Sequence, residues 1–488
     1  MNIRITATAA MSPATSMKVL AVLLACTLFV PKVTFSADAG NASDSLSLPP
    51  LFSDHMVLQR GQPTNIWGLA EPGKVVEVLF RKTRVETKAD SKGHWAMVLP
   101  AMDVGGPYQM TIKSGLATRT INDVFWGEVW LAAGQSNMAF RFGFSDEDDK
   151  AKALAILKNA DIRMYKVAAI VSGGKLLKEN DVPWTPASRE EVADWSAVAL
   201  YFAQALQVEE GVAIGIINSS QGSSTIEAWM SPAALAKAKS SGYISTKTYD
   251  DIRRHYRNPS VLHQSMLSKI VPYTLKGVLW YQGESNGGEA ESYRILLPAL
   301  VESWRGLWDQ KLPFLFAQLP AYEPPDDKTG QSWARFRQAQ AEVDKTVPGT
   351  GMVVLIDAGD KHNIHPKKKK IVGDRFANLA MAQVYGKNVA YTGPVMEKIE
   401  YDGDRAIVSL HLAGKDLVVK GEVIKGFSVK SGEGIWYSAS AEATGNKVVV
   451  WHPEVGKVTG VRYGWANAPE VNLYNNHGYP AAPFIHEH

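Results

Sequence analysis

Two loops of the sequence carry residue types that could perform nucleophilic catalysis, and the first contains Ser136. This serine lies in residues 134–138 (GQSNM), directly after an apolar run typical of a buried strand. A serine at the carboxyl end of such a strand can be activated by a histidine base, and N–H groups at a helix start can hold an oxyanion. A helix N-cap is the structural alternative for this serine. Because the pentapeptide is not GxSxG, it does not indicate an α/β-hydrolase nucleophile elbow.

The second loop, residues 357–366 (DAGDKHNIHP), holds two carboxylates and two histidines, and also follows an apolar run. Such a cluster could bind a metal, but its spacings match no metal motif that we can justify. A general base with an orienting carboxylate uses the same residue types. We therefore expect a histidine base here, and neither a metal nor a cofactor.

Two further loops have a related composition. Residues 218–223 (NSSQGS) and 280–286 (WYQGESN) each offer amide donors and a glycine whose N–H could approach a ligand. All four loops fall at carboxyl ends of predicted strands, which is where open α/β folds place their sites. That shared position is stronger evidence for one site than any single motif.

The segments that must position these loops alternate between strand-like and helical patterns. This alternation predicts an α/β fold with a parallel sheet. We expect Pro366 to be the first residue of the last helix, and the four lysines 367–370 to form a solvated helix face. The predicted strands are 124–133, 212–218, 277–281, 314–319 and 352–356, and the predicted helices are 198–209, 289–308, 333–345 and 367–385.

Both ends of the chain have a β pattern, with short apolar runs cut by turn residues. We expect the two ends to build one accessory β-sandwich. The expected organisation is a signal peptide (1–39), an N-terminal β segment (46–120), a catalytic domain (121–388) and a C-terminal β segment (389–488).

The first 39 residues resemble a secretory signal. Arg4 and Lys18 precede an apolar run over 19–30 that is shorter than the roughly 20 residues of a membrane span. We expect a periplasmic or secreted protein with no membrane insertion after signal removal. Cys26, the only cysteine, lies in this segment, so the mature chain would have no disulfide. A lipobox-like sequence before Cys26 leaves a lipoprotein as the alternative.

The composition excludes some classes of function. The 488 residues allow for more than one domain, and 45% hydrophobic with 21% charged residues is a globular balance. Lys+Arg 52 against Asp+Glu 49 gives a net charge of +3 that is spread along the chain, so we expect no nucleic-acid partner. The 14 tryptophans and 17 tyrosines suit stacking on sugars, although core packing is their commoner use.

At this point the sequence resembles a known family, the sialate O-acetylesterase-like carbohydrate acetylesterases of the SGNH (GDSL-like) hydrolase superfamily. The resemblance covers nearly the whole chain after the predicted signal. It is carried by residues 51–60 (LFSDHMVLQR), 134–138 (GQSNM), 280–286 (WYQGESN), 364–366 (IHP) and 460–467 (GVRYGWAN).

The resemblance implies a flavodoxin-like SGNH core with a β accessory domain, and hydrolysis of acetyl esters on sugars or glycans without a metal. It implies Ser136 as nucleophile and His365 as base. The implied oxyanion hole consists of the N–H groups of Ser136 and Gly222 with the side chain of Gln282 or Asn286.

One departure from the family concerns the acid. SGNH enzymes commonly place it three residues before the histidine, where this chain has His362. We take Asp360 as the acid and Asp357 as the reserve, and a Ser–His dyad oriented by a backbone carbonyl is also open. We expect Glu284 to brace its loop rather than to act directly.

The remaining choices concern the sugar and the class of function. Trp229, Trp280, Tyr281 and Tyr322 could form a sugar platform or pack in the core. A non-catalytic carbohydrate-binding β protein is the rival interpretation, and a GDSL-type esterase or lipase of other acyl specificity is a second.

Overall fold

The computed structural model describes residues 46–157, 161–172, 175–176, 180–244 and 248–488. The predicted signal peptide, including Cys26, therefore lies outside the described residues. Within these ranges, no helix combines the length and apolar character needed to cross a bilayer.

The centre of the fold is a mainly parallel sheet in the order β11-β8-β12-β7-β13-β14-β15, in which the edge strand β11 is antiparallel. Three of its strands, β12, β13 and β14, are buried along their whole length, which explains their largely apolar sequences. The predicted α/β class is confirmed. Because the strands other than β11 run parallel, their carboxyl ends lie at one edge of the sheet. The bounds are β7 (Ala117–Gly134), β8 (Ile162–Lys166), β11 (Val182–Pro186), β12 (Ile214–Ser220), β13 (Gly277–Tyr281), β14 (Phe314–Ala317) and β15 (Thr350–Val353).

The register brings the ends of three central strands to the same level. Gly134, the last residue of β7, pairs with Ser220 of β12 on one side and Tyr281 of β13 on the other. From β7 the chain continues to β8 and from β13 to β14, in opposite directions along the sheet. Such a divergence is the switch point at which open α/β sheets bind ligands.

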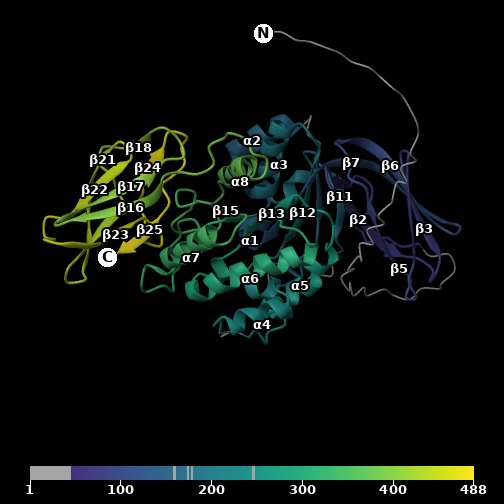
Figure 1. The fold of residues 1–488 in the computed structure, drawn as a ribbon, viewed down its shortest axis with the longest axis horizontal. Coiled ribbons are helices and arrows are strands. Elements are labelled where there is room, and N and C mark those ends of the chain that lie inside the picture. The colour runs from purple at the N-terminus through teal and green to yellow at the C-terminus, as the bar shows by residue number, and fades with distance from the viewer. Residues whose placement is uncertain (1–45, 158–160, 173–174, 177–179, 245–247) are drawn as a thin grey trace, which may run out of the picture. The chain divides into compact units, whose positions relative to one another are not determined.

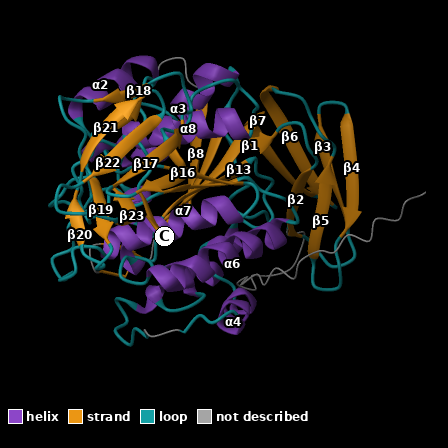
Figure 2. Ribbon diagram, turned by 60° about the vertical axis from the view of Figure 1, so that its left-hand side comes forward, coloured by secondary structure: helices purple, strands orange, loops and turns teal. Residues whose placement is uncertain are grey.

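Helices cover both faces of this sheet. Their bounds are α1 (Ser136–Ala139), α2 (Glu147–Ile156), α3 (Ala197–Glu210), α4 (Pro232–Ser240), α5 (Val261–Ser265), α6 (Ala290–Trp308), α7 (Ser332–Thr346) and α8 (Lys370–Gln383). Figures 1 and 2 show α3 and α8 on one face and α6 and α7 on the other. The helix α3 begins after Ser196, whose side chain accepts a hydrogen bond from the N–H of Ala199, and ends at Gly211 in the left-handed conformation.

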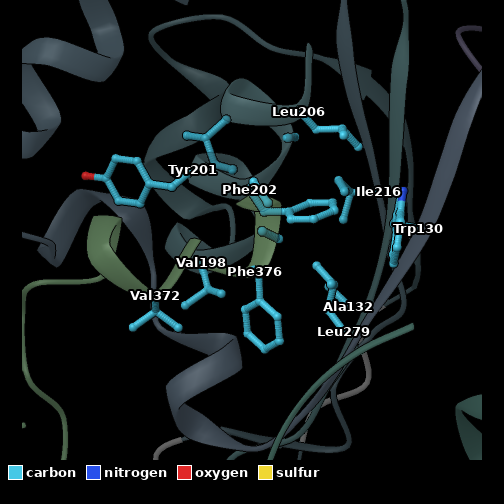
Figure 3. Close-up of a cluster of buried hydrophobic side chains, with 14 of the residues drawn as sticks. Trp130, Ala132, Val198, Tyr201, Phe202, Leu206, Ile216, Leu279, Val372 and Phe376 are labelled. Carbon is cyan, nitrogen blue, oxygen red and sulfur yellow. The ribbon is translucent and has the colours of Figure 1, made fainter. Parts of the chain in front are cut away.

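The core between α3, α8 and the sheet combines aliphatic and aromatic side chains (Figure 3). Trp130 of β7 meets Phe202 of α3 edge to face, with ring centroids 5.1 Å apart. Phe376 of α8 is fully buried in the same cluster. This core fixes the strand ends and the helix that follows the histidine loop.

Four N-terminal strands, β1, β3, β4 and β6, belong to the same sheet as the central strands, whereas β2 and β5 pair with each other in a separate two-stranded sheet. Their bounds are β1 (Val57–Gln59), β2 (Thr64–Leu69), β3 (Val75–Phe80), β4 (Thr83–Lys88), β5 (His94–Leu99) and β6 (Gly105–Ser114). The first half of β7 pairs with β6, and β1 pairs with β7 in parallel. The strand β7 thus crosses the boundary expected at residue 120 without a break.

The C-terminal strands form their own antiparallel sheets, β16-β17-β22-β21, β20-β19-β23-β25 and β18-β24. Their bounds are β16 (Val395–Asp402), β17 (Arg405–His411), β18 (Leu417–Val419), β19 (Phe427–Ser431), β20 (Trp436–Ser438), β21 (Ser440–Thr444), β22 (Lys447–Trp451), β23 (Val458–Tyr463), β24 (Leu473–Asn475) and β25 (Phe484–Glu487). Side chains such as Val408, Val429 and Val461 form a core of C-terminal residues.

This pairing corrects the expectation of one sandwich built from both ends. Among the described strands, those of the N-terminal segment pair with each other and with β7, whereas those of the C-terminal segment pair only with each other. The reason is that β6 and β1 complete their hydrogen bonding on the long strand β7. The β pattern of both ends was therefore correctly interpreted, and their association was not.

A second correction concerns the start of α8. The helix begins at Lys370, so Pro366 precedes it instead of opening it. Lys367 and Lys368 are exposed as expected for a solvated face, but Lys369 is fully buried. Its environment is part of the site described next.

Candidate active site

Ser136 and His365 meet at the carboxyl end of the central sheet. The Ser136 Oγ lies 2.8 Å from Nε2 of His365, although the two residues are 229 positions apart. The turn that presents the serine requires Gly134, which has a φ of 137°. A Cβ added to Gly134 would lie 2.1 Å from the carbonyl oxygen of Tyr281. The close approach of β7 and β13 therefore fixes where the serine emerges.

The surroundings of His365 hold its backbone in place and lower the pKa of its imidazole. The side-chain oxygen of Asn363 accepts a hydrogen bond from the His365 N–H at 2.9 Å. Partial burial, and secondarily the charge of Lys369, lower the pKa of His365. A lowered pKa favours the unprotonated imidazole at neutral pH, which is the form that can accept a proton from a serine.

The structure does not bring Asp360 to His365. The Oδ1 of Asp360 instead accepts hydrogen bonds from the N–H groups of His362 and Asn363, at 2.9 and 3.1 Å. This is the local turn that an aspartate makes with the residues that follow it, and it keeps the carboxylate within its own exposed segment. We expected Asp360 to orient His365, but in the described residues no hydrogen bond joins the two side chains.

Asp357, the reserve, is also directed away from His365. Its two carboxylate oxygens accept hydrogen bonds from the guanidinium of Arg375 in α8, at 2.7 and 2.8 Å. Arg375 also donates to the carbonyl of Val354, and both charged side chains are largely buried. The pair ties the histidine loop to α8. Among the described residues, neither aspartate makes a hydrogen bond to the imidazole of His365.

The two aspartates should therefore respond differently to amidation. We expect Asp357→Asn to lower the melting temperature by several degrees, because it leaves the buried Arg375 without its anion, a loss of about 3–5 kcal/mol for such pairs. We expect Asp360→Asn to retain kcat within about threefold, because the amide oxygen can still accept the two turn hydrogen bonds. Steady-state kinetics and thermal unfolding of both variants check this. A large loss of kcat in Asp360→Asn at unchanged melting temperature would show that this carboxylate reaches His365 during turnover.

Gly222, which follows β12, lies beside the serine. A Cβ added to Gly222 would be 3.8 Å from the Cβ of Ser136. In the described part of the chain, neither the Gly222 N–H nor the Ser136 N–H donates a hydrogen bond to another group. Two unpaired N–H donors beside a serine hydroxyl are the elements of an oxyanion hole. The next residue, Ser223, has a φ of 58°, and it holds this tight turn in an unfavourable conformation.

The side chains of Gln282 and Asn286 do not complete that hole. The Gln282 Nε2 donates to the carbonyl of Ser224 and to Oδ1 of Asn286, and the Asn286 Nδ2 donates to the carboxylates of Glu227 and Glu289. An amide nitrogen has two hydrogens, so both are fully engaged. This corrects the expectation that one of them stabilises an oxyanion. Their buried network instead supports the loops after β12 and β13.

A buried ionisable pair behind the dyad was missed by sequence reasoning. Glu284 and Lys369 contact opposite ends of the Asn137 amide, each at 2.5 Å. The expected bracing role of Glu284 agrees with this contact. Lys369 gave no sequence signal of its own, because it lies in a run of four lysines whose other members have exposed or ion-paired side chains.

The aromatic residues considered as a sugar platform divide clearly. Trp229, Trp280 and Tyr281 are fully buried and pack in the core. Tyr322 is half-buried, and its ring meets that of Trp333 edge to face with centroids 5.4 Å apart. Of the four, Tyr322 is the one with a surface that could contact a sugar.

No group of three or more histidine, cysteine, aspartate or glutamate side chains in the described ranges is arranged to hold a metal ion. The two histidines of the 357–366 loop also differ in their surroundings. His365 contacts Ser136, whereas His362 is exposed.

The comparisons with known proteins agree with this geometry. Residues 126–382 match the family model described as "Carbohydrate esterase, sialic acid-specific acetylesterase". The sialate O-acetylesterase of Homo sapiens is 30% identical to this chain, over 89% of the chain and 91% of the relative, and that of Mus musculus is 27% identical over 94% and 96%. The crystal structure of a carbohydrate acetylesterase from Xanthomonas citri is 34% identical, with a TM-score of 0.82, over 90% of this chain and 99% of that one.

A serine–histidine contact at the switch point of an SGNH-like sheet, together with these relatives, makes the protein a carboxylic ester hydrolase. The chain belongs to the carbohydrate esterase family of sialic acid-specific acetylesterases.

Proposed function

We propose that this protein removes acetyl groups from carbohydrate hydroxyls through an acyl-enzyme intermediate on Ser136. The observation that carries the proposal is the 2.8 Å contact between the Ser136 hydroxyl and His365 at the carboxyl end of the sheet. The acetylesterase relatives support the acetyl group as the acyl part of the substrate.

In the proposed reaction, His365 Nε2 takes the proton of Ser136 as Oγ attacks the acetyl carbonyl carbon. The developing oxyanion accepts hydrogen bonds from the N–H groups of Ser136 and Gly222. The imidazolium then gives its proton to the sugar oxygen, which leaves as the free hydroxyl. Water, activated by the same imidazole, attacks the acetyl-serine ester and releases acetate. The lowered pKa of His365 supports its role as the base in the first step.

The substrate that we propose is an acetylated sugar or glycan met outside the cytoplasm. The signal-like sequence over residues 1–39 favours that location, and the half-buried ring of Tyr322 suits contact with a sugar face. Acetylated sialic acid, xylan, xyloglucan and pectin are the candidates to compare.

Acetate release tests the proposal directly. We expect hydrolysis of p-nitrophenyl acetate, with kcat/KM for the butyryl ester at least about tenfold lower because the larger acyl group must fit an acetyl site. Activity should survive prolonged treatment with EDTA, because every proposed step uses side chains and water. The four acetylated glycans then identify the sugar.

Three results would contradict the proposal. Binding of glycans without acetate release would favour a carbohydrate-binding protein, and a preference for longer acyl chains would favour an esterase or lipase of other specificity. Loss of activity on chelation, restored by zinc, would make the histidine loop a metal site.

A further inference from the structure

The amide of Asn137 connects the two halves of the dyad. Asn137 directly follows Ser136, and its Nδ2 donates a hydrogen bond at 3.0 Å to the carbonyl of Ile364, the residue directly before His365. The side chain next to the serine therefore holds the backbone next to the histidine. A shift of this amide would change the 2.8 Å separation between the two reacting side chains.

The neighbours of Asn137 determine which way its amide points. A backbone carbonyl can only accept a hydrogen bond, so the nitrogen of the amide must face Ile364. The same nitrogen donates to Oε1 of Glu284, and the oxygen accepts from Nζ of Lys369. An ammonium can only donate and a carboxylate can only accept, so the two charged groups enforce the orientation that Ile364 requires.

The surroundings of Lys369 are those of a functional rather than a surface lysine. Its side chain is fully buried, and Nζ lies 4.8 Å from the ring centroid of Phe140 and 5.8 Å from that of Tyr281. A buried ammonium is costly unless it is paired and hydrogen-bonded. Here it makes one hydrogen bond to Asn137, while the carboxylate of Glu284 lies across the same amide.

We propose that Lys369 and Glu284 are positioning residues which, through the amide of Asn137, hold His365 against Ser136. The inference rests on the proposed function and extends it to residues that do not touch the reacting atoms.

The charge of Lys369 gives this arrangement a measurable electrostatic effect. The groups that face His365 are the Ser136 hydroxyl and the Lys369 ammonium, and those that face Lys369 are Asn137, Glu284 and two aromatic rings. Burial lowers the pKa of Lys369 to about 7, while Glu284 raises it. Below that pH the ammonium disfavours the imidazolium, so its removal must raise the pKa of His365. The acidic limb of the pH profile of kcat/KM would then move to higher pH.

The variant Lys369→Met tests this, with Lys368→Met as the matched control. Methionine fills a similar volume without charge, and Lys368 is the exposed lysine next in sequence. For Lys369→Met we expect kcat for p-nitrophenyl acetate to fall about 10- to 100-fold, as for misplacement of a catalytic group by a fraction of an ångström, with KM within about threefold. The acidic limb of the pH profile of kcat/KM should move to higher pH in Lys369→Met. Lys368→Met should match the wild type both in kcat and in the position of this limb.

A second variant keeps the test decisive if Lys369→Met does not fold. The double variant Lys369→Met/Glu284→Gln removes both buried charges together. It must still move the acidic limb to higher pH, although by less, because Lys369 is the charge that lowers the pKa of His365 and loss of the Glu284 carboxylate acts in the opposite direction. A folded variant with an unmoved limb overturns the inference, as does an equal movement in Lys368→Met. Wild-type protein without esterase activity would instead overturn the proposed function, so the two failures are distinguishable.

Discussion

Replacement of Ser136 by alanine is expected to lower kcat by at least about 10³-fold, as loss of a nucleophilic serine does in related mechanisms. The melting temperature should stay close to that of the wild type. The reason is that the Ser136 hydroxyl makes a hydrogen bond to His365 and to no other group in the described part of the chain. Steady-state kinetics with p-nitrophenyl acetate and thermal unfolding measure the two quantities.

Ser438→Ala is the matched control for this variant. Ser438 is an exposed serine of β20, far in sequence from both reacting residues, and no hydrogen bond of its hydroxyl occurs among the described residues. Ser438→Ala should retain activity. Brief incubation with the acetyl ester followed by mass spectrometry should find an added acetyl group on the wild type and none on Ser136→Ala. Turnover by Ser136→Ala at a rate near that of the wild type would refute the serine mechanism.

Removal of the chain after Asn388 is expected to give insoluble or inactive protein. Arg337 of α7 is fully buried, and its guanidinium donates to the backbone carbonyls of Ala466 and Asn467. Without those carbonyls a buried charge would lose its partners, at a cost of about 3–5 kcal/mol. Soluble expression and esterase activity of the truncated chain are the measurements. A soluble, fully active product would show that the C-terminal segment is an independent module.

A point variant tests the same contact without deletion. The side chain of Asn467 accepts a hydrogen bond from the N–H of Trp333 and donates one to Asp327, at 2.9 and 2.8 Å. Asn467→Ala should therefore lower the free energy of unfolding by about 2–4 kcal/mol, because a buried N–H and a carboxylate lose their partner. Asn446→Ala, in an exposed turn of the same segment, should cost less than about 1 kcal/mol.

Local patterns predicted the core of the fold because buried parallel strands and amphipathic helices have distinct periodicities. The run 277–281 is β13 without change, and the helix expected over 289–308 is α6 (Ala290–Trp308). Pairing between distant segments has no such signature. The β-rich ends were therefore recognised as β structure, but the sequence did not reveal that β6 and β1 pair with β7.

The candidate site divides in the same way. The sequence predicted the positions of Ser136 and His365 because each lies in a polar loop directly after a predicted strand, and strand ends can be read from the apolar pattern. Asp360 accepts hydrogen bonds from nearby backbone N–H groups, and Gln282 and Asn286 donate to nearby acceptors; sequence does not reveal which of these competing donors and acceptors lie within reach. Burial of Lys369 within a run of lysines depends on how the chain enters α8, and here the pattern of charges was misleading.

The contact of Asn467 with the core also has a consequence for the order in which the chain becomes active during synthesis. The backbone N–H of Tyr322 donates to the carbonyl of Asn467, and the N–H of Glu323 donates to the carbonyl of Lys361 in the loop that carries His365. A ribosome makes Ser136 and His365 well before Asn467. At that stage the nascent chain contains both reacting residues. The loop of Tyr322 and Glu323, which contacts the histidine loop, still lacks its hydrogen bond to Asn467. Esterase activity should accordingly appear only once residues 466 and 467 have been made and have folded back onto α7.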